Sequence, residues 1–406
     1  MLGARYARIL RAPRTARLLL PTLVARIPDA IAATAIAVLV RSVTGSYSTA
    51  GLAAGAFGIG TAVSAPLAGR ALDRFGQRRV LPVLALVFAG LLAALAVGTG
   101  HLSHVAVDTL AAAAGLTRPP VEAALRAVWP RIVPADAVDT AYSLDSTTQE
   151  LIWIGGPLLL AALLATGNPR LPLLACAVLT AGGTALYAMG LPPHTASRRD
   201  GSRRPPSPLR RGRLRVLLLS AFGYGMAAGV LNLTLIAFAA RHGGVAWAGV
   251  LVAVWGCGSL AGGLIYGSRD WPATVELRAM ACLALFGAGL ALLAAAPSLA
   301  VLTLLMIPLG LPLSPWLGSL SSAVQRCVPG ASATEAFAWL FAVITAGMAA
   351  GNAAGGALIQ AAGTRTAFLA AAGLALAGAL AGVLLGDRTG PAPSEARLAS
   401  ESRAPG

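Results

Sequence analysis

The side chains best suited to chemistry in this sequence are ionisable groups inside long apolar segments. Arg26 and Asp29 lie three residues apart, and Arg118 and Glu122 lie four apart, so each pair shares one face of a helix. A charged group among membrane-spanning helices is costly and marks an ion or substrate pathway. We therefore expect these residues to couple a proton or to meet a substrate, and a fixed ion pair between Arg26 and Asp29 is the structural alternative.

The dipeptide Pro119-Pro120 follows Arg118 directly. Because proline lacks an amide donor, we expect it to kink this helix. Prolines recur in a later apolar segment, at Pro308, Pro312 and Pro315. Arg118 and Glu122 lie near one end of their segment, so a snorkelling or latch role is the alternative to coupling.

Glu150 is the fifth candidate for proton or substrate coupling, because burial of a carboxyl group favours its protonated form. Asp145 and Ser146 precede it, and both residue types cap helices. We therefore expect the helix that holds Glu150 to begin at about residue 147.

The composition indicates that these residues lie in a membrane protein. Of the 406 residues, 57% are apolar and 11% are charged, and the mean hydropathy is +0.75. Soluble domains have about 45–50% apolar and about 25% charged residues. Despite the formal net charge of +16, this composition excludes an ordinary soluble enzyme, a disordered protein and a nucleic-acid-binding protein.

Twelve apolar segments are long enough to span a bilayer, which takes roughly 20 residues per helix. They lie at about 17–41, 48–69, 80–99, 104–127, 147–166 and 171–191, and at about 215–240, 246–267, 277–296, 299–324, 334–361 and 366–386. The sequence thus predicts an all-α polytopic protein with two six-helix halves, 1–191 and 214–388. Residues 192–213 are rich in Pro, Ser and Arg and form the predicted linker, and 389–406 form a predicted disordered tail.

The two halves resemble copies of each other. An offset of 195 residues aligns Pro120 with Pro315, Arg131 with Arg326 and Pro134 with Pro329. An offset of 198 aligns Gly58 with Gly256 and Gly60 with Gly258. Parallel six-plus-six repeats are a known transporter architecture, so we expect two pseudo-symmetric bundles.

The distribution of arginine predicts the topology. With the N-terminus in the cytoplasm, 25 arginines fall on the cytoplasmic side and four fall on the opposite side. This asymmetry follows the positive-inside rule. We expect a multi-pass protein of the bacterial cytoplasmic membrane with both termini inside, and the basic linker lying over anionic lipid.

Residues 69–81, GRALDRFGQRRVL, lie between the second and third predicted spans. They resemble the signature loop of the major facilitator superfamily, roughly G-x-L-A-D-R-x-G-R-K-x-x-L, at Gly69, Asp73, Arg74, Gly76 and Arg78. The resemblance implies a twelve-helix transporter fold and a cytoplasmic latch that includes Asp73. The sequence departs from the pattern at Gln77, which replaces a basic residue.

A second motif favours the drug:proton antiporter branch of this superfamily, whose fifth span carries G-x-x-x-G-P-x-x-G-G. The fifth span of this chain keeps Gly156 and Pro157, and its repeat mate has Gly347, Gly351 and Gly355. Small residues four apart also favour close helix packing, so a packing or gating role is equally compatible.

We therefore expect a monomeric secondary transporter that exports a small apolar compound in exchange for protons. Proton-coupled uptake of a sugar or organic acid is the alternative, and a non-transporting membrane sensor or scaffold is a less favoured one. No ATP-binding loop, zinc motif or nucleophile elbow occurs in the sequence, so neither cofactor, metal nor enzymatic activity is expected.

Overall fold

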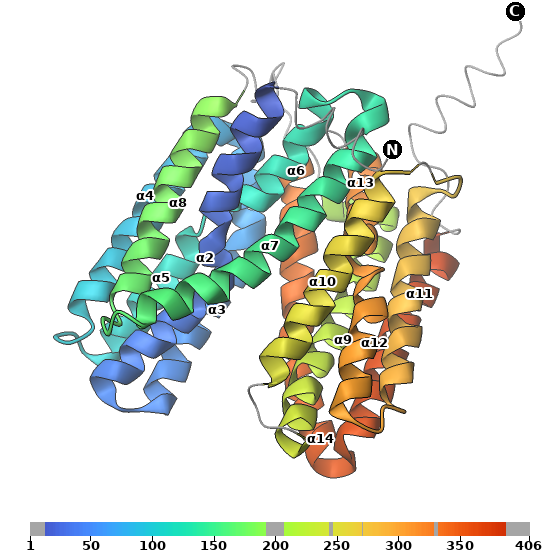
Figure 1. The fold of residues 1–406 in the computed structure, drawn as a ribbon. Coiled ribbons are helices and arrows are strands. Elements are labelled where there is room, and N and C mark those ends of the chain that lie inside the picture. Colours follow the sequence, from blue (N-terminus) through green and yellow to red (C-terminus); the bar gives the residue numbers. More distant parts are fainter. Residues whose placement is uncertain (1–12, 192–206, 243–246, 270, 329–331, 387–406) are drawn as a thin grey trace, which may run out of the picture. The chain divides into compact units, whose positions relative to one another are not determined.

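The computed structural model describes residues 13–191, 207–242, 247–269, 271–328 and 332–386. Within these ranges every regular element is a helix (Figure 1). Ten helices are long and apolar enough to cross a membrane. The predicted linker residues 192–206 and the predicted tail 389–406 lie outside the described residues.

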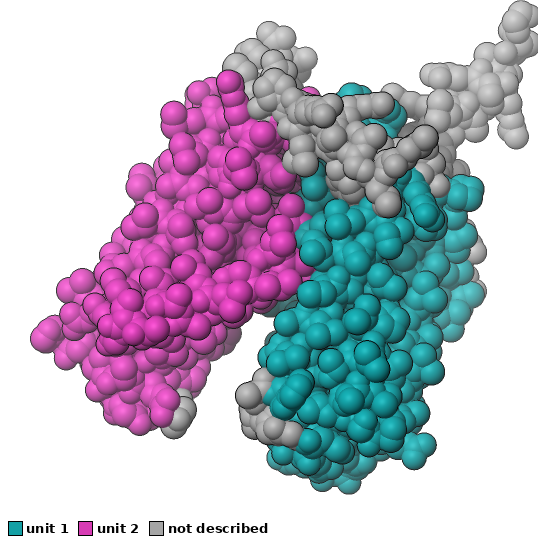
Figure 2. Space-filling view, viewed as in Figure 1, with its two compact units in different colours: residues 1–7, 134–147, 204–406 teal, residues 8–133, 148–203 magenta. Residues whose placement is uncertain are grey.

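The described chain forms two compact units, coloured separately in Figure 2. Of the described residues, unit 2 contains 13–133 and 148–191. Its helices are α2 (Pro13–Thr44), α3 (Tyr47–Phe75), α4 (Gln77–Gly98), α5 (His104–Thr117), α6 (Val121–Ile132), the second part of α7 (Val138–Leu164), and α8 (Leu171–Gly190). Its core is an apolar cluster that includes Ile31, Phe57, Phe88 and Leu92.

Unit 1 contains residues 134–147 and the described residues from 207 to 386. It begins with a 3-10 turn (Ala135–Ala137) and the first turns of α7. A second 3-10 turn (Pro208–Arg210) then leads into α9 (Gly212–His242), α10 (Trp247–Gly267), α11 (Val275–Leu293), α12 (Leu299–Gly310), α13 (Leu313–Cys327) and α14 (Ala333–Gly386). Residues 138–147 of α7 therefore pack with unit 1, and its remaining residues pack with unit 2.

Side-chain caps define where several helices begin. The hydroxyl groups of Ser46, Ser103, Thr274 and Ser298 each accept a hydrogen bond from the amide three residues later, at 3.3–3.4 Å. These bonds satisfy amides that have no partner inside the helix.

The proline-rich segments are broken helices. Residues 118–120 separate α5 from α6, and the residues around Pro312 separate α12 from α13. The long α14 is likewise two helical arms joined at Gly363, whose φ of +79° suits glycine. The paired α5–α6 and the two arms of α14 account for the predicted spans that do not appear as separate long helices.

The predicted start of the fifth span is wrong. Helix α7 begins at Val138, nine residues earlier than expected, so Asp145 and Ser146 lie inside it rather than capping it. Both are buried, and the Ser146 hydroxyl donates to the Tyr142 carbonyl at 2.9 Å. The polar residues before Glu150 are helical because they pack inside unit 1 and not at a helix end.

The internal repeat is visible in how glycines bring helices together. A Cβ on Gly60 of α3 would meet the Leu116 amide at 2.9 Å, and one on Gly115 of α5 would meet the Thr61 amide at 2.8 Å. The equivalent glycines of unit 1, Gly258 and Gly310, face each other across α10 and α12 in the same way. Small residues at these positions let the helix backbones touch.

Candidate functional site

Unit 2 holds a network of buried and half-buried charges between α2 and the α5–α6 break. The Arg118 guanidinium group makes two contacts with the Asp29 carboxylate, from Nε to Oδ1 at 2.8 Å and from Nη2 to Oδ2 at 2.7 Å. This is the paired geometry in which a guanidinium group binds a carboxylate most strongly. Asp29 on α2 is thus tied to the residue that ends α5.

Glu122 is the second acid of the network and lies between two arginines. Its Oε1 is 3.1 Å from Nη2 of Arg26 on α2 and 3.6 Å from Nη2 of Arg126 on its own helix. Arg26 also donates to the Oε1 of Gln149 on α7. Arg26 and Arg126 are 1% and 0% exposed, so their charges depend on these partners.

The structure brings the two predicted pairs, Arg26 with Asp29 and Arg118 with Glu122, into one network, but the ion pairs join residues of different pairs. Arg26 and Asp29 share a helix face, but their ion pairs run to Glu122 and Arg118 on the other helices. We refer to Arg26, Asp29, Arg118, Glu122 and Arg126 as the ionic network. It contains three positive and two negative groups.

The helix break that positions Arg118 follows from its two prolines. The carbonyls of Gly115 and Leu116 would normally accept from residues 119 and 120, which have no amide hydrogen. The Arg118 amide donates to Gly115 at 3.3 Å instead, and the Ser64 hydroxyl of α3 donates to Leu116. These substitutes are needed because an unsatisfied carbonyl is costly in a membrane.

Glu150 lies in the middle of α7, next to the Gln149 that contacts Arg26. It is half-buried. The longer α7 therefore places Glu150 inside a helix and not at its end.

The repeat places no charged side chain of unit 1 at the positions of the acids and arginines of the ionic network, and it places an aromatic residue at the position of Arg26. The offset of 198 maps Arg26 onto Tyr224 of α9. The Tyr224 ring lies 4.0 Å from that of Trp316 and 5.5 Å from that of Phe286, which stacks on Trp255 at 6.1 Å. The indole N–H groups of Trp255 and Trp316 have no hydrogen-bond partner within the described residues. The two units thus offer different chemistry at equivalent positions.

The loop of the signature motif is a tight turn. Gly76 has φ of +88° and donates its amide to the Leu72 carbonyl at 2.9 Å, which ends α3. Gly69 is buried and Asp73 is half-buried. Arg74 and Arg78 are exposed, and Arg74 lies 5.0 Å from the centre of the Phe75 ring.

Gln77, the departure from the motif, has a packing role that the sequence did not reveal. It is 5% exposed. Its Nε2 donates to the Ala124 carbonyl of α6 at 3.0 Å, and its Oε1 accepts from the Tyr187 hydroxyl of α8 at 3.1 Å. A neutral amide satisfies both partners, whereas a buried cation would not.

The glycines proposed for gating lie at close helix contacts. A Cβ on Gly156, which precedes Pro157 in α7, would meet the Ala30 Cβ of α2 at 2.8 Å. Gly347, Gly351 and Gly355 form one stripe on α14, against the backbone of α9. The facing glycines of α9, Gly225 and Gly229, were not identified from the sequence. They show that the stripe joins two helices within unit 1.

An acid that sequence reasoning missed, Asp139, anchors the first turns of α7 in unit 1. Its Oδ2 is 3.1 Å from Nη2 of Arg278 on α11 and 3.8 Å from Nη2 of Arg326 on α13. One turn later the Ser143 hydroxyl donates to the Gly263 carbonyl of α10 at 3.0 Å. The clue in the sequence was two acids, Asp136 and Asp139, in a segment on the side where most of the arginines are expected.

Within the described ranges, no group of three or more His, Cys, Asp and Glu side chains could hold a metal ion.

Comparisons with known proteins agree with this architecture. The family model described as Major Facilitator Superfamily matches residues 18–271, more than half of the chain. No match was found among proteins of curated function.

Several solved transporters share the fold at low sequence identity. The human organic anion transporter MFSD10 (TETRAN) is similar with a TM-score of 0.75 and 18% identity, over 91% of this chain and 99% of that one. A bacterial homologue of the iron transporter ferroportin in its outward-facing state has a TM-score of 0.73 and 16% identity, over 92% and 98%. The proton:xylose symporter XylE has a TM-score of 0.62 and 15% identity, over 92% and 95%. At such identities the likeness concerns the fold.

Proposed function

We propose, from the premise that this chain belongs to the Major Facilitator Superfamily and is a secondary transporter, that it exports a small, largely apolar compound in exchange for protons. It is a multi-pass membrane protein of a family that is not enzymatic. The observation that carries the proton-coupled part is the ionic network, because two half-buried acids, Asp29 and Glu122, pair there with arginines among the apolar helices of unit 2.

Within the network, Asp29 is the residue we assign to the proton. Asp29 and Arg118 are 17% and 26% exposed, whereas Arg26 and Arg126 are almost fully buried. The Asp29–Arg118 pair is thus the less buried of the two pairs that α2 makes. Protonation of Asp29 removes one charge of the pair and weakens the tie between α2 and the α5–α6 break, and so couples a proton to a change at a hinge.

Glu122 has a different proposed role. It separates two buried guanidinium groups, which would repel each other if it were neutral. Glu122 thus holds α2 and α6 together through the cycle. Glu150, beside the Gln149 that contacts Arg26, is the second candidate carrier of the proton.

The proposed substrate follows from the aromatic residues of unit 1. Tyr224 and Trp316 are buried against each other, so we propose that they contact an apolar compound in a state of the cycle that opens this aromatic cluster. The buried indole N–H groups of Trp255 and Trp316, which have no partner among the described residues, also favour a compound with a hydrogen-bond acceptor. Proton-coupled uptake of an organic acid is for this reason the second candidate function.

We place the chain in the cytoplasmic membrane of a bacterium with both termini inside, because 25 arginines then face the cytoplasm. In this orientation the turn at Gly76 is cytoplasmic. We propose that the loop with Gly69, Asp73, Arg74, Gly76 and Arg78 stabilises one state of the alternating-access cycle, in which access to a midplane site switches sides.

A transport assay tests the proposed direction and coupling. The chain is expressed in a bacterial strain without its own efflux pumps, and accumulation of a panel of apolar fluorescent dyes and radiolabelled organic acids is measured. Export predicts lower dye accumulation, which a protonophore reverses. Higher accumulation of an organic acid would favour uptake, and no change for any compound would support a non-transporting scaffold.

Transport by purified protein in vesicles with an imposed pH gradient tests whether Asp29 carries the proton. Asp29→Asn is expected to abolish the response of transport to the gradient. The matched control is Glu276→Gln, because Glu276 also pairs with an arginine, Arg213, at 3.1 Å and with similar exposure. Transport by Asp29→Asn that still follows the pH gradient would exclude Asp29, and the same loss in Glu150→Gln would assign the proton to Glu150.

A further inference from the structure

A cavity of about 680 Å³ lies in unit 2, beside the N-terminal turns of α2 and the C-terminal end of α8. Its volume falls within the range of ligand sites, about 300–1,000 Å³. It does not touch the ionic network, and the proposed transport function does not use it.

The walls of this cavity are almost entirely apolar. Leu20, Leu186 and Met189 line it and are 63%, 56% and 72% exposed. In a membrane protein, such exposed apolar side chains face lipid chains and not water. The cavity is therefore open toward the bilayer.

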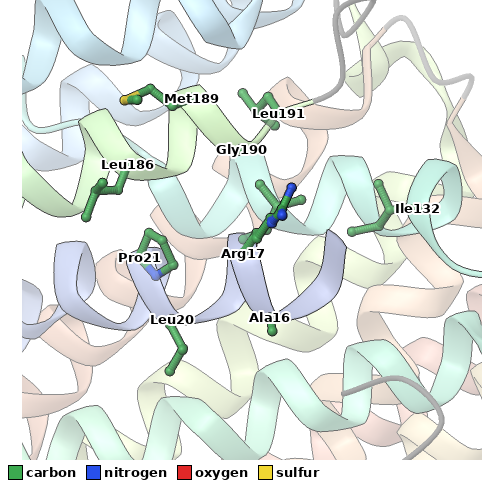
Figure 3. A pocket seen from close by; sticks show the side chains of 10 residues that line it. Ala16, Arg17, Leu20, Pro21, Ile132, Leu186, Met189, Gly190 and Leu191 are labelled. Atoms are coloured by element: carbon green, nitrogen blue, oxygen red, sulfur yellow. The ribbon is translucent and has the colours of Figure 1, made fainter. Parts of the chain in front are cut away.

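One charged side chain enters the cavity. Arg17 reaches from α2 into the space between the end of α8 and Ile132 of α6 (Figure 3). It is exposed, and among the described residues no acid pairs with it. Arg17 lies in the first turn of a span that runs from Thr15 to Thr44, at the depth where lipid headgroups lie.

The same turn also presents a backbone acceptor. Pro21 has no amide hydrogen, so the Arg17 carbonyl lacks its normal helical donor. This carbonyl faces Gly190, which lines the cavity, because a Cβ on Gly190 would meet it at 3.1 Å. A guanidinium donor and a carbonyl that lacks its donor four residues later thus lie together at the polar end of an apolar cavity.

We propose that this cavity binds one anionic phospholipid with a hydroxylated headgroup, of the phosphatidylglycerol type. The phosphate pairs with the Arg17 guanidinium, and a headgroup hydroxyl donates to the Arg17 carbonyl. An acyl chain lies along Leu20, Leu186 and Met189. The positive charge at the polar end and the apolar wall beneath it match the two parts of such a lipid.

The internal repeat supplies a matched control. The offset of 198 places Arg17 on Arg215 of α9, which is also an exposed arginine in the first turns of its helix. A general attraction of basic helix ends to an anionic bilayer would involve both arginines equally. A specific lipid site in this cavity would depend on Arg17 and not on Arg215.

The test measures lipid binding to the purified full-length protein by native mass spectrometry. Short-chain phosphatidylglycerol is titrated against phosphatidylcholine of the same chains, and inorganic phosphate with glycerol serves as the headgroup without chains. We expect one phosphatidylglycerol to bind with preference, and Arg17→Gln to weaken it about tenfold, as loss of one charged contact does. Arg215→Gln is expected to leave binding unchanged.

A second variant keeps the charge and fills the cavity. Leu186→Trp changes an exposed lining residue, so the fold is expected to persist, and it should reduce phosphatidylglycerol binding while Arg17 remains. Equal weakening by Arg17→Gln and Arg215→Gln, equal binding of phosphatidylcholine, or full binding by Leu186→Trp would each overturn the proposal. Binding of phosphate and glycerol as strong as that of phosphatidylglycerol would also overturn it, because the cavity would then be a site for a small anion and not for a lipid.

Discussion

Replacing Glu122 by Gln removes the one acid that lies between two buried guanidinium groups. Arg26 and Arg126 are 1% and 0% exposed and lie 3.1 and 3.6 Å from its carboxylate. Removing one partner of a buried pair costs about 3–5 kcal/mol, because the remaining charge is left without compensation. We expect Glu122→Gln to lower the free energy of unfolding of the protein by that amount.

A double-mutant cycle separates this pair from general loss of packing. Arg26→Gln leaves Glu122 paired with Arg126, so we expect it to cost only about 1.5–3 kcal/mol, the worth of a charged hydrogen bond. Adding Glu122→Gln to Arg26→Gln then costs less than it does alone. The expected coupling free energy between the two positions is about 1–3 kcal/mol.

Reversible unfolding in mixed detergent micelles measures the four members of the cycle. The control cycle uses Arg213 and Glu276, which are 20% and 19% exposed and should show a coupling of about 1 kcal/mol or less. Additive effects of Arg26→Gln and Glu122→Gln, within about 0.5 kcal/mol, would refute the ionic network as an energetic unit.

Three further substitutions test other parts of the structure. Asp73→Asn should reduce the transport rate without changing membrane insertion, and unchanged turnover in vesicles would contradict the latch. Gln77→Arg restores the basic residue of the family motif but buries a charge, so we expect a loss of stability of about 1–3 kcal/mol in thermal unfolding; a gain would contradict the packing role. Gly351→Ala should cost about 1–3 kcal/mol, because its Cβ would meet the Met226 Cα at 2.9 Å. Gly249→Ala on α10, where a Cβ meets nothing within 4 Å, is the control and should not destabilise.

The fold could be predicted because its signals are local. Apolar length marks each span, prolines without amide hydrogens mark the breaks at 118–120 and near Pro312, and Gly76 marks the tight turn after α3. The repeat also predicts glycines on the correct helices, but it does not predict which helix each glycine contacts. All of these depend on neighbours in the sequence.

The partners within the site could not be predicted, because they depend on residues far apart in the chain. Arg26 and Asp29 share a face, but their ion pairs run to residues about ninety positions away. Helix α7 was predicted too short because its polar first turns look like a cap, whereas Asp139 and Ser143 find partners on α11 and α10. The packing role of Gln77 likewise requires α6 and α8 beside it.

The three arginines of the ionic network limit how many protons a transport cycle can use. A guanidinium group does not release its proton in a protein, so within the network a proton can bind only Asp29 or Glu122, while the second candidate carrier, Glu150, is outside the network. The first proton raises the net charge of the network from one to two, and a second would raise it to three inside an apolar unit, at a steeply growing electrostatic cost. Under the proton coupling that we propose, the network therefore favours a stoichiometry of one proton per cycle. At zero membrane potential, each pH unit across the membrane then sustains about a tenfold concentration ratio of an uncharged substrate.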